Sequence, residues 1–377
     1  MNRSFVIDLL KIVAAQSIVL HHLSVYGPMA DLIHQAWPAA SDAFIEYSRL
    51  AVQVFLVIGG YLAAQAIRFD TPAPSPTQVG QLVWRRYARL IPPYLLALAL
   101  ISAVVWLCRG HIFGDWLVAA PTWGSVLAHA LTLQGLLDLP SLSAGVWYVA
   151  MDFQLYVLLM LLVAAARTPR VLSLAVAGLC AASMLYFNRH VVLDNWSLYF
   201  FGSYGLGVLA GWSRRTPQNA RLFVGMISVA LLALWMAPRI RLEVALATAV
   251  VLAISAQWRS PVQWMGQHLG VLMQRLADSS YGTFLTHYGV IVIVSAMWDL
   301  THRIGLVWAF AASIAAWSLS VGTGMAFHLW VEQPLSRRVS ALWQRARATS
   351  HIATHTMPTS QPWPPHTRTP QTSPRLH

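Results

Sequence analysis

Charged residues are scarce in this sequence. Asp, Glu, Lys and Arg together account for 10% of its 377 residues, whereas 57% are hydrophobic. A soluble domain normally carries about 25% charged residues, so this shortage excludes a soluble enzyme of ordinary composition and indicates a polytopic membrane protein. The 17 tryptophans fit this class, because Trp concentrates at the headgroup level of a bilayer.

Cysteine and acidic residues are also few. The two cysteines, Cys108 and Cys180, lie in different apolar segments without ligand spacing, which excludes a disulfide framework and a zinc site. Thirteen acidic residues against 25 basic ones give a net charge of +12. In a soluble protein this excess would suggest nucleic acid, but membrane proteins concentrate Arg in their cytoplasmic loops. We therefore expect no metal and no nucleic-acid partner.

Ten apolar runs approach or exceed the length needed to cross a bilayer. They fall at about 5–26, 48–67, 88–108, 147–166, 171–187, 196–213, 221–237, 242–257, 280–299 and 305–329. A further apolar stretch at 124–137 is too short to span and is expected to be re-entrant or interfacial. The sequence predicts an all-α polytopic membrane protein with about ten transmembrane helices around a central polar cavity.

Arginine is distributed unevenly between the connecting segments. Ten spans place both termini on one side, and 18 of the 24 arginines lie in segments on that side. The positive-inside rule then makes both termini cytoplasmic. Residues 1–335 form the predicted transmembrane domain and 336–347 a basic juxtamembrane segment. Residues 348–377, rich in Pro, Thr, Ser and His, are predicted to be a disordered cytoplasmic tail.

The first apolar run carries Asp8, Lys11, His21 and His22. An ionisable group inside a bilayer costs about 2.5–3.5 kcal/mol, so such groups are expected to face a partner or a cavity. At about 100° per residue, Lys11 and His22 return to within about 20° of one face, and Asp8 lies one turn from Lys11 as a possible counter-ion. We expect Lys11 and His22 to mark the inner and outer parts of one continuous cavity.

His22 is the candidate general base, because the pKa of an imidazole lies near operating pH. It sits near the outer end of its helix, where a substrate hydroxyl could approach from the far side of the membrane. Taken alone, a histidine that merely bonds to a neighbouring helix is an equally good interpretation. Because Asp8 and Lys11 lie on the same side of the helix, we favour a functional role for His22.

Three other places carry polar groups within or beside the apolar runs. Arg85, Arg86 and Arg89 end a predicted loop, 68–93, before a helix expected to start near Pro92. Guanidinium groups bind phosphate oxygens bidentately, although arginines at a cytoplasmic helix end are also ordinary topology signals.

Asp152 and Gln154 follow Trp147 and Tyr148 into the membrane and indicate a polar pocket, and His287 lies on the polar face of another run. Gly59 and Gly60 interrupt the second run and could allow close approach of two backbones.

Six segments occur in the order found in the membrane-bound acyltransferase-3 family, which the chain resembles over almost its whole length except the tail. They are residues 5–22, FLVIGGYL (55–62), RRYARLIPPY (85–94), WYVAMDFQLY (147–156), SYGTFLTH (280–287) and VEQP (331–334). The chain departs from the family pattern in having Lys11 for Arg, Gly59 for Ser and Asp152 for Glu. The resemblance implies a ten-helix bacterial inner-membrane protein that passes an acetyl or succinyl group from cytoplasmic acyl-CoA to an extracytoplasmic carbohydrate.

The same resemblance assigns roles to Lys11, His22, Arg86, Arg89, Trp147 and Asp152, and the polar residues near them in the sequence extend these roles to Asp8, Arg85, Tyr148 and His287. His22 corresponds to the essential histidine, with Asp8, Lys11 and Asp152 expected to assist it. Arg85, Arg86 and Arg89, together with Lys11, are expected to bind acyl-CoA, most simply acetyl-CoA, as a co-substrate rather than a resident cofactor. Trp147, Tyr148 and His287 are expected to contact the carbohydrate acceptor. No serine nucleophile with a base at defined spacing is visible, which favours direct transfer.

Two other classes of function remain open from the sequence. A transporter could use the same intramembrane polar groups, and an inactive scaffold could retain them.

Overall fold

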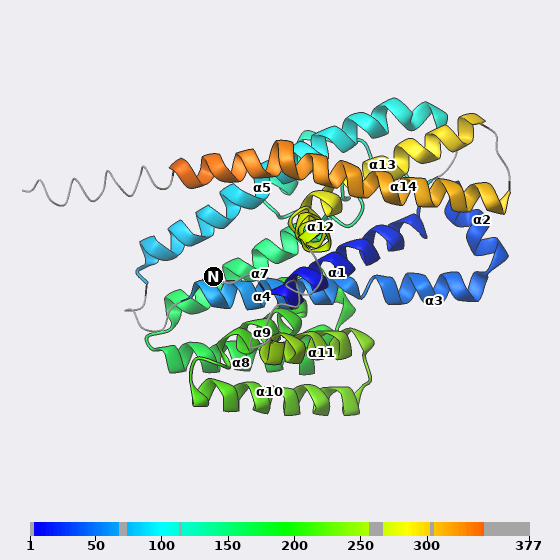
Figure 1. Ribbon diagram of the computed structural model, residues 1–377. Coiled ribbons are helices and arrows are strands. Elements are labelled where there is room, and N and C mark those ends of the chain that lie inside the picture. Colours follow the sequence, from blue (N-terminus) through cyan, green and yellow to red (C-terminus); the bar gives the residue numbers. More distant parts are fainter. Residues whose placement is uncertain (1–3, 68–73, 113–114, 256–266, 302–304, 343–377) are drawn as a thin grey trace, which may run out of the picture. The chain divides into compact units, whose positions relative to one another are not determined.

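The computed structural model describes residues 4–67, 74–112, 115–255, 267–301 and 305–342. All regular secondary structure in these ranges is helical (Figure 1). The predicted tail, 348–377, and the last part of the basic segment 336–347 lie outside the described residues. Residues 4–336 belong to one compact unit.

The α-helices are α1 (Phe5–Leu23), α2 (Pro28–Ala36), α3 (Pro38–Ser48), α4 (Ala51–Ala66), α5 (Pro76–Cys108), α6 (Trp123–Ala130), α7 (Trp147–Ala165), α8 (Pro169–Leu185), α9 (Ser197–Trp212), α10 (Pro217–Met236), α11 (Ile240–Ser255), α12 (Gln267–Asp278), α13 (Ser280–Thr301) and α14 (Leu306–Phe327). The described ranges also contain short 3-10 turns η1 (Arg109–His111), η2 (Phe187–Arg189) and η3 (Val191–Leu193) and a π-helical turn η5 (His328–Glu332). Residues 333–342, which follow η5, are again α-helical.

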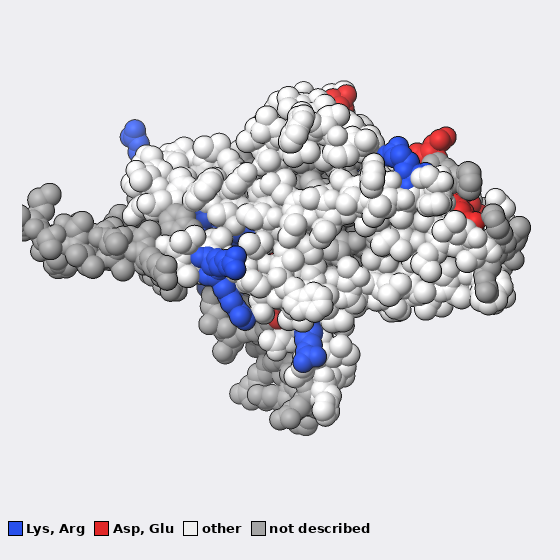
Figure 2. Space-filling view, turned by 90° about the horizontal axis from the view of Figure 1, so that it is seen from above, with Lys and Arg blue, Asp and Glu red and all other residues white. Residues whose placement is uncertain are grey.

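Each of the ten predicted spans contains a helix, so the predicted all-α polytopic fold is confirmed. Within the described residues, eight helical stretches are long and apolar enough to cross a membrane. The remaining two, α9 and α11, have 16 residues each. Helix α9 is almost wholly buried among its neighbours. The space-filling view agrees with a membrane protein, because charged side chains are sparse and wide areas are uncharged (Figure 2).

Helix α5 corrects one prediction from the sequence. It begins at Pro76, not near Pro92, and Pro92 and Pro93 lie inside it. Its start is fixed by a capping box in which the Gln78 backbone N–H donates to Ser75 Oγ (3.3 Å) and the Ser75 N–H donates to Gln78 Oε1 (2.8 Å). The paired prolines resemble a helix start because they lack N–H donors. A membrane helix tolerates them in its interior where neighbouring groups satisfy the freed carbonyls.

Glycine brings α4 and α9 into backbone contact. A Cβ atom on Gly60 would lie 2.0 Å from the carbonyl oxygen of Tyr204, and one on Gly207 would lie 2.0 Å from that of Val57. The predicted close approach at Gly59–Gly60 therefore occurs, and α4 runs through both glycines without a break. Figure 1 shows α8, α10 and α11 gathered with α9 on one side of α4.

Two hydrophobic clusters surround the region where the candidate site lies. One is built mainly from α4 and α7–α11, and the other from α1, α5, α7 and α13. Helices α1, α4, α5 and α7 contribute to both clusters, so they lie at the junction of the two packed groups. Of these four, α1 ends at the cavity described below, and α4 and α7 begin there.

The α4–α9 contact predicts the outcome of a matched pair of glycine substitutions. Gly60→Ala should lower the thermal unfolding midpoint in detergent, because its Cβ would overlap a backbone oxygen and overpacking costs about 1–3 kcal/mol. Gly225→Ala in α10 is the control, since nothing lies within 4 Å of a Cβ there, and it should be neutral or slightly stabilising. Equal midpoints for the two variants would contradict the contact.

Candidate active site

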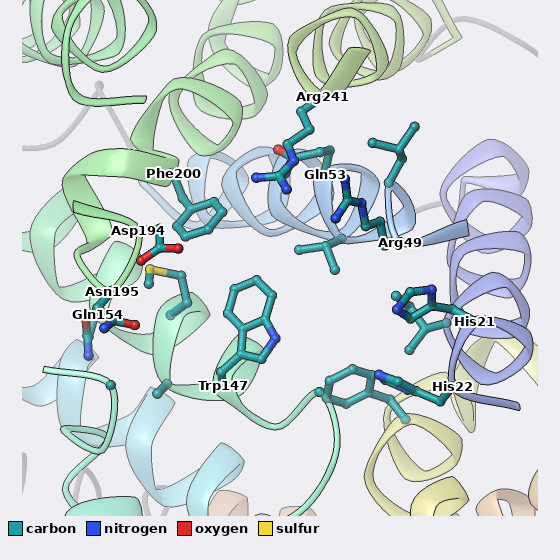
Figure 3. Close-up of a pocket in the computed structure, with 18 of the residues that line it drawn as sticks. His21, His22, Arg49, Gln53, Trp147, Gln154, Asp194, Asn195, Phe200 and Arg241 are labelled. Carbon is teal, nitrogen blue, oxygen red and sulfur yellow. The ribbon is translucent and has the colours of Figure 1, made fainter. Parts of the chain in front are cut away.

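A cavity of about 480 Å³ lies where several helix ends meet. Its wall includes the last turn of α1, the first turns of α7 and α11, the start of α4, and the segment that precedes α9. Figure 3 shows His21 and His22 at one end, Gln154, Asp194 and Asn195 at the other, and Trp147 between them. A volume of this size is in the range of small-molecule sites.

His22 is held by a second histidine from a distant part of the chain. His22 Nδ1 lies 2.7 Å from His287 Nε2 on α13. The ring planes are within 13° of parallel and the centroids are 4.9 Å apart. The nitrogen–nitrogen distance is short while the ring centres remain far apart, so the two nitrogen atoms lie nearly on the line between the centres. The hydrogen bond therefore runs close to the planes of both rings. His22 is 7% exposed and lines the cavity, whereas His287 is completely buried.

The partners of His287 fix the tautomers of a neutral pair. His287 Nδ1 lies 2.8 Å from the carbonyl oxygen of Phe284, and a carbonyl can only accept, so Nδ1 carries the hydrogen. His287 Nε2 is then an acceptor, and His22 Nδ1–H must donate to it. The hydrogen of His22 is thus on Nδ1, and its Nε2 keeps a free lone pair. A nitrogen in that state is ready to take a proton.

Gly145 supports the other side of the His22 ring. Its φ is +74°, and a Cβ built on it would lie 2.9 Å from His22 Cε1. Both the left-handed backbone and the contact require glycine at this position. The His22 ring is therefore confined between the loop that precedes α7 and α13.

The loop between α6 and α7 brings Gln134 to the cavity. Thr132 adopts φ +59°, which is unusual for a β-branched residue. Its carbonyl oxygen accepts a hydrogen bond from Gln154 Nε2 on α7 (2.7 Å). Gln134 lines the cavity and is 1% exposed, and neither atom of its side-chain amide has a hydrogen-bond partner within the described chain. A buried amide without partners is suited to bind a polar ligand.

His129 anchors the same loop from α6. Burial lowers the pKa of His129, which keeps the ring neutral near pH 7. Its Nδ1–H donates to the carbonyl oxygen of Ser125 (2.7 Å), and its Nε2 accepts from the backbone N–H of Leu142 (3.3 Å). The completely buried ring therefore has a structural role, tying the end of the loop to the short helix.

The buried Asp152 and the partly buried Arg86 form an ion pair away from this cavity wall. Arg86 Nη2 lies 2.5 Å from Asp152 Oδ2, and the guanidinium carbon lies 5.2 Å from the centre of the Tyr156 ring. Asp152 is 5% exposed. Gly59 packs against the carboxylate, since its Cβ would lie 2.9 Å from Asp152 Oδ1. Asp152, the predicted catalytic acid, is thus the counter-ion of Arg86, which the sequence predicts to bind the phosphate groups of acyl-CoA.

The remaining predicted residues lie apart from His22. Arg85 and Arg89 are exposed on α5, on a helix rather than on the predicted loop. Asp8 and Lys11 are partly buried on α1 and both have interaction partners. On α1 the cavity wall consists of Ile18, His21 and His22, so this cavity does not extend to Lys11 as the single continuous cavity would require.

Of the three predicted acceptor contacts, Trp147 alone lies on the wall of this cavity. It is 38% exposed, and its ring lies 5.5 Å from that of Phe200. Tyr148 packs instead between Phe55 and Phe284, and His287 lies behind His22.

Sequence reasoning assigned no site role to several residues on the wall. They are His21, Arg49, Gln53, Gln134, Asp194, Asn195, Phe200 and Arg241. Most lie in helix first turns or loops, where no periodic pattern marks them. Arg49 and Arg241 did carry a signal, because they belong to the six arginines on the side of the membrane where the sequence predicts few.

The Arg86–Asp152 pair predicts non-additive stability losses. Asp152→Asn should lower the free energy of unfolding by about 3 kcal/mol, because it leaves a guanidinium unpaired among buried groups. The double variant Arg86→Gln/Asp152→Asn should lose less than the sum of the two single losses. Thermal unfolding in detergent measures this, with Glu46→Gln as the control that removes an exposed acid. Strict additivity would contradict the pairing.

The sequence is similar to known proteins. No solved structure matches the chain. A segment of 161 residues is 25% identical to the regulator of hypoxia-inducible factor 1 of Caenorhabditis elegans, and it covers 40% of this chain and 32% of that protein. The match thus spans about a third of the relative's length. Residues 5–325 match the acyltransferase domain of acyltransferase family 3, a range that contains every predicted site residue. The chain therefore belongs to acyltransferase family 3.

Proposed function

We propose that this protein transfers an acyl group, acetyl or succinyl, from cytoplasmic acyl-CoA to a hydroxyl group of an extracytoplasmic carbohydrate. The observation that carries the proposal is His22, which lines the cavity and whose Nδ1–H is committed to His287. Its Nε2 is left as a proton acceptor beside a space large enough for a sugar. The family supplies the reaction class.

The transfer follows from these atoms. The acceptor hydroxyl gives its proton to His22 Nε2 while its oxygen attacks the thioester carbonyl carbon. The tetrahedral intermediate collapses, the carbon–sulfur bond breaks, and the imidazolium of His22 returns the proton to the leaving CoA thiolate. The products are an ester and free CoA. His287 Nε2 accepts from His22 Nδ1–H throughout, so it orients the ring and stabilises the transient positive charge.

The donor would bind on the opposite side of the bundle. Arg85 and Arg89 are exposed on the N-terminal part of α5, which the arginine distribution assigns to the cytoplasm. Their guanidinium groups suit the phosphates of CoA. Arg86, already paired with Asp152, contributes to the position of α5 against α7 instead. The protein would then lie in a bacterial inner membrane with both termini in the cytoplasm.

The acceptor would occupy the cavity beside His22. Its wall combines aromatic rings, Trp147 and Phe200, with side-chain amides such as Gln134 and Gln154. Aromatic faces pack against the apolar face of a sugar ring, and amides bond to hydroxyl groups in either direction. This lining supports a carbohydrate acceptor over a purely apolar one.

Substitutions at the two histidines test the proposed base. His22→Ala should abolish transfer of label from radiolabelled acetyl-CoA to envelope carbohydrate, while the protein still inserts into the membrane. His287→Ala should lower kcat by about 10²-fold, in the range of lost acid–base assistance, with KM for acetyl-CoA unchanged. His287→Gln should recover part of the loss, because its Oε1 can accept from His22 Nδ1–H.

Two results would count against this assignment. Retained transfer in His22→Ala would remove the base, and equal losses in His287→Ala and His287→Gln would remove the positioning role. Movement of a sugar across the membrane without consumption of the thioester would identify a transporter instead.

The donor assignment predicts a difference between neighbouring arginines. Arg85→Gln/Arg89→Gln should raise KM for acetyl-CoA by about tenfold, since two charge-assisted phosphate contacts are lost, and should leave the unfolding midpoint unchanged. Arg86→Gln should instead lower the unfolding midpoint. Steady-state kinetics and thermal unfolding on the same preparations separate the two effects. An unchanged KM for acetyl-CoA in the double variant would mean that Arg85 and Arg89 do not bind the donor and act only as topology signals.

A further inference from the structure

We propose that the acceptor sugar carries an anionic group, a carboxylate or a phosphate, which Arg49 and Arg241 bind. This inference rests on the proposed function, in that the acceptor occupies the cavity beside His22. Arg49 lies at the junction of α3 and α4, and Arg241 lies in the first turn of α11. Both line the same cavity, and Figure 3 shows them on the wall that also carries Gln53, across from Trp147.

Neither arginine is neutralised by the protein. Within the described chain, no ion pair or hydrogen bond engages the Arg241 side chain, and Arg49 has one weak contact, 4.0 Å to Glu46. That pair is about half exposed on both sides and contributes little. Among the described residues of the cavity wall, Asp194 is the one acid, and Figure 3 places it at the end away from His22. The part of the cavity near His22 therefore carries excess positive charge.

This placement is unusual for arginines of a membrane protein. The predicted topology assigns six arginines to the extracytoplasmic side against 18 on the cytoplasmic side. Two of those six line the same cavity, although they come from distant parts of the chain. Paired guanidinium groups in a partly enclosed space favour planar or tetrahedral oxyanions, which accept several of their N–H donors at once.

Two other features of the wall specify a sugar rather than a simple anion. The buried amide of Gln134 has no partner in the described chain and can bond to a hydroxyl group. Trp147 presents a partly exposed ring in the middle of the cavity (Figure 3). A ligand that uses the arginines, the amide and the ring together is an acidic sugar such as a hexuronate or a sugar phosphate. Its anionic group would fix which hydroxyl lies beside His22.

Binding of matched probes to the full-length protein in detergent tests the proposal. Methyl β-D-glucuronide and glucose 6-phosphate should bind at least tenfold more tightly than methyl β-D-glucoside at low salt, by calorimetry or saturation-transfer NMR. Arg49→Gln/Arg241→Gln should abolish this preference. Arg109→Gln is the matched control, because Arg109 is exposed, lies outside the cavity and bonds only to the carbonyl oxygen of Val118 among the described residues.

The outcomes separate the anionic groups from one another and from the enzyme assignment. The stronger of the two charged probes identifies carboxylate or phosphate. Equal affinity for charged and neutral sugars, a preference that survives in the double variant, or occupancy by anionic phospholipid in nanodiscs with no sugar binding would each overturn the inference. Arginine-dependent binding of glucuronide without consumption of acetyl-CoA would refute the enzyme proposal and keep the anion site. Acetylation of a neutral sugar that is equally fast in the Arg49→Gln/Arg241→Gln variant would refute the anion site and keep the enzyme proposal.

Discussion

Polar side chains buried in a membrane helix bundle are stabilised by partners within the protein, and the main contacts between the helices around the site follow from this constraint. Water is absent from a bilayer core, so an unpaired polar group there is costly. His22 satisfies the constraint through His287, Asp152 through Arg86, and Gln53 through Ser203 Oγ, which donates to its Oε1 at 2.6 Å. Each pair also joins two helices, so the contact that satisfies the polar groups also positions the helices.

The arrangement at His22 differs chemically from the serine hydrolase triad. There a carboxylate receives the hydrogen bond from the histidine that acts as base. Here a second neutral imidazole takes that place, and its own N–H is held by the carbonyl oxygen of Phe284. A neutral partner orients the ring without adding a buried negative charge. It also stabilises an imidazolium less than a carboxylate would, which suits a base that must release its proton again to a thiolate.

The sequence was sufficient for the long apolar helices, but it did not predict α2, α3 or α12, and it predicted the site only in part. Long apolar runs are local signals, so ten helices could be predicted from them, and His22 could be singled out because an ionisable group in an apolar run is costly. The start of α5 was missed because Pro92 and Pro93 resemble a helix start more strongly than the cap at Ser75 does. Long-range pairs such as Arg86–Asp152 and His22–His287 leave no trace in the local pattern.

The cavity wall was the hardest part to predict, because its residues come from the ends of different helices. Arg49, Gln134 and Arg241 line one cavity only because three separate segments of the chain come together there. For Asp8 and Lys11, spacing along α1 alone could not give the extent of a cavity.

The paired prolines of α5 have a mechanical consequence. Pro92 and Pro93 remove two consecutive rungs from the hydrogen-bond ladder of a 33-residue helix, and a helix is least stiff where rungs are missing. Tyr281 on α13 braces this point by donating from its hydroxyl to the carbonyl oxygen of Leu90 (3.0 Å). Bending of α5 is therefore concentrated between the exposed Arg85 and Arg89 and the half of the helix that packs in the bundle. The N-terminal part of α5 can therefore change its tilt relative to the rest of the helix, with the bend close to Tyr281.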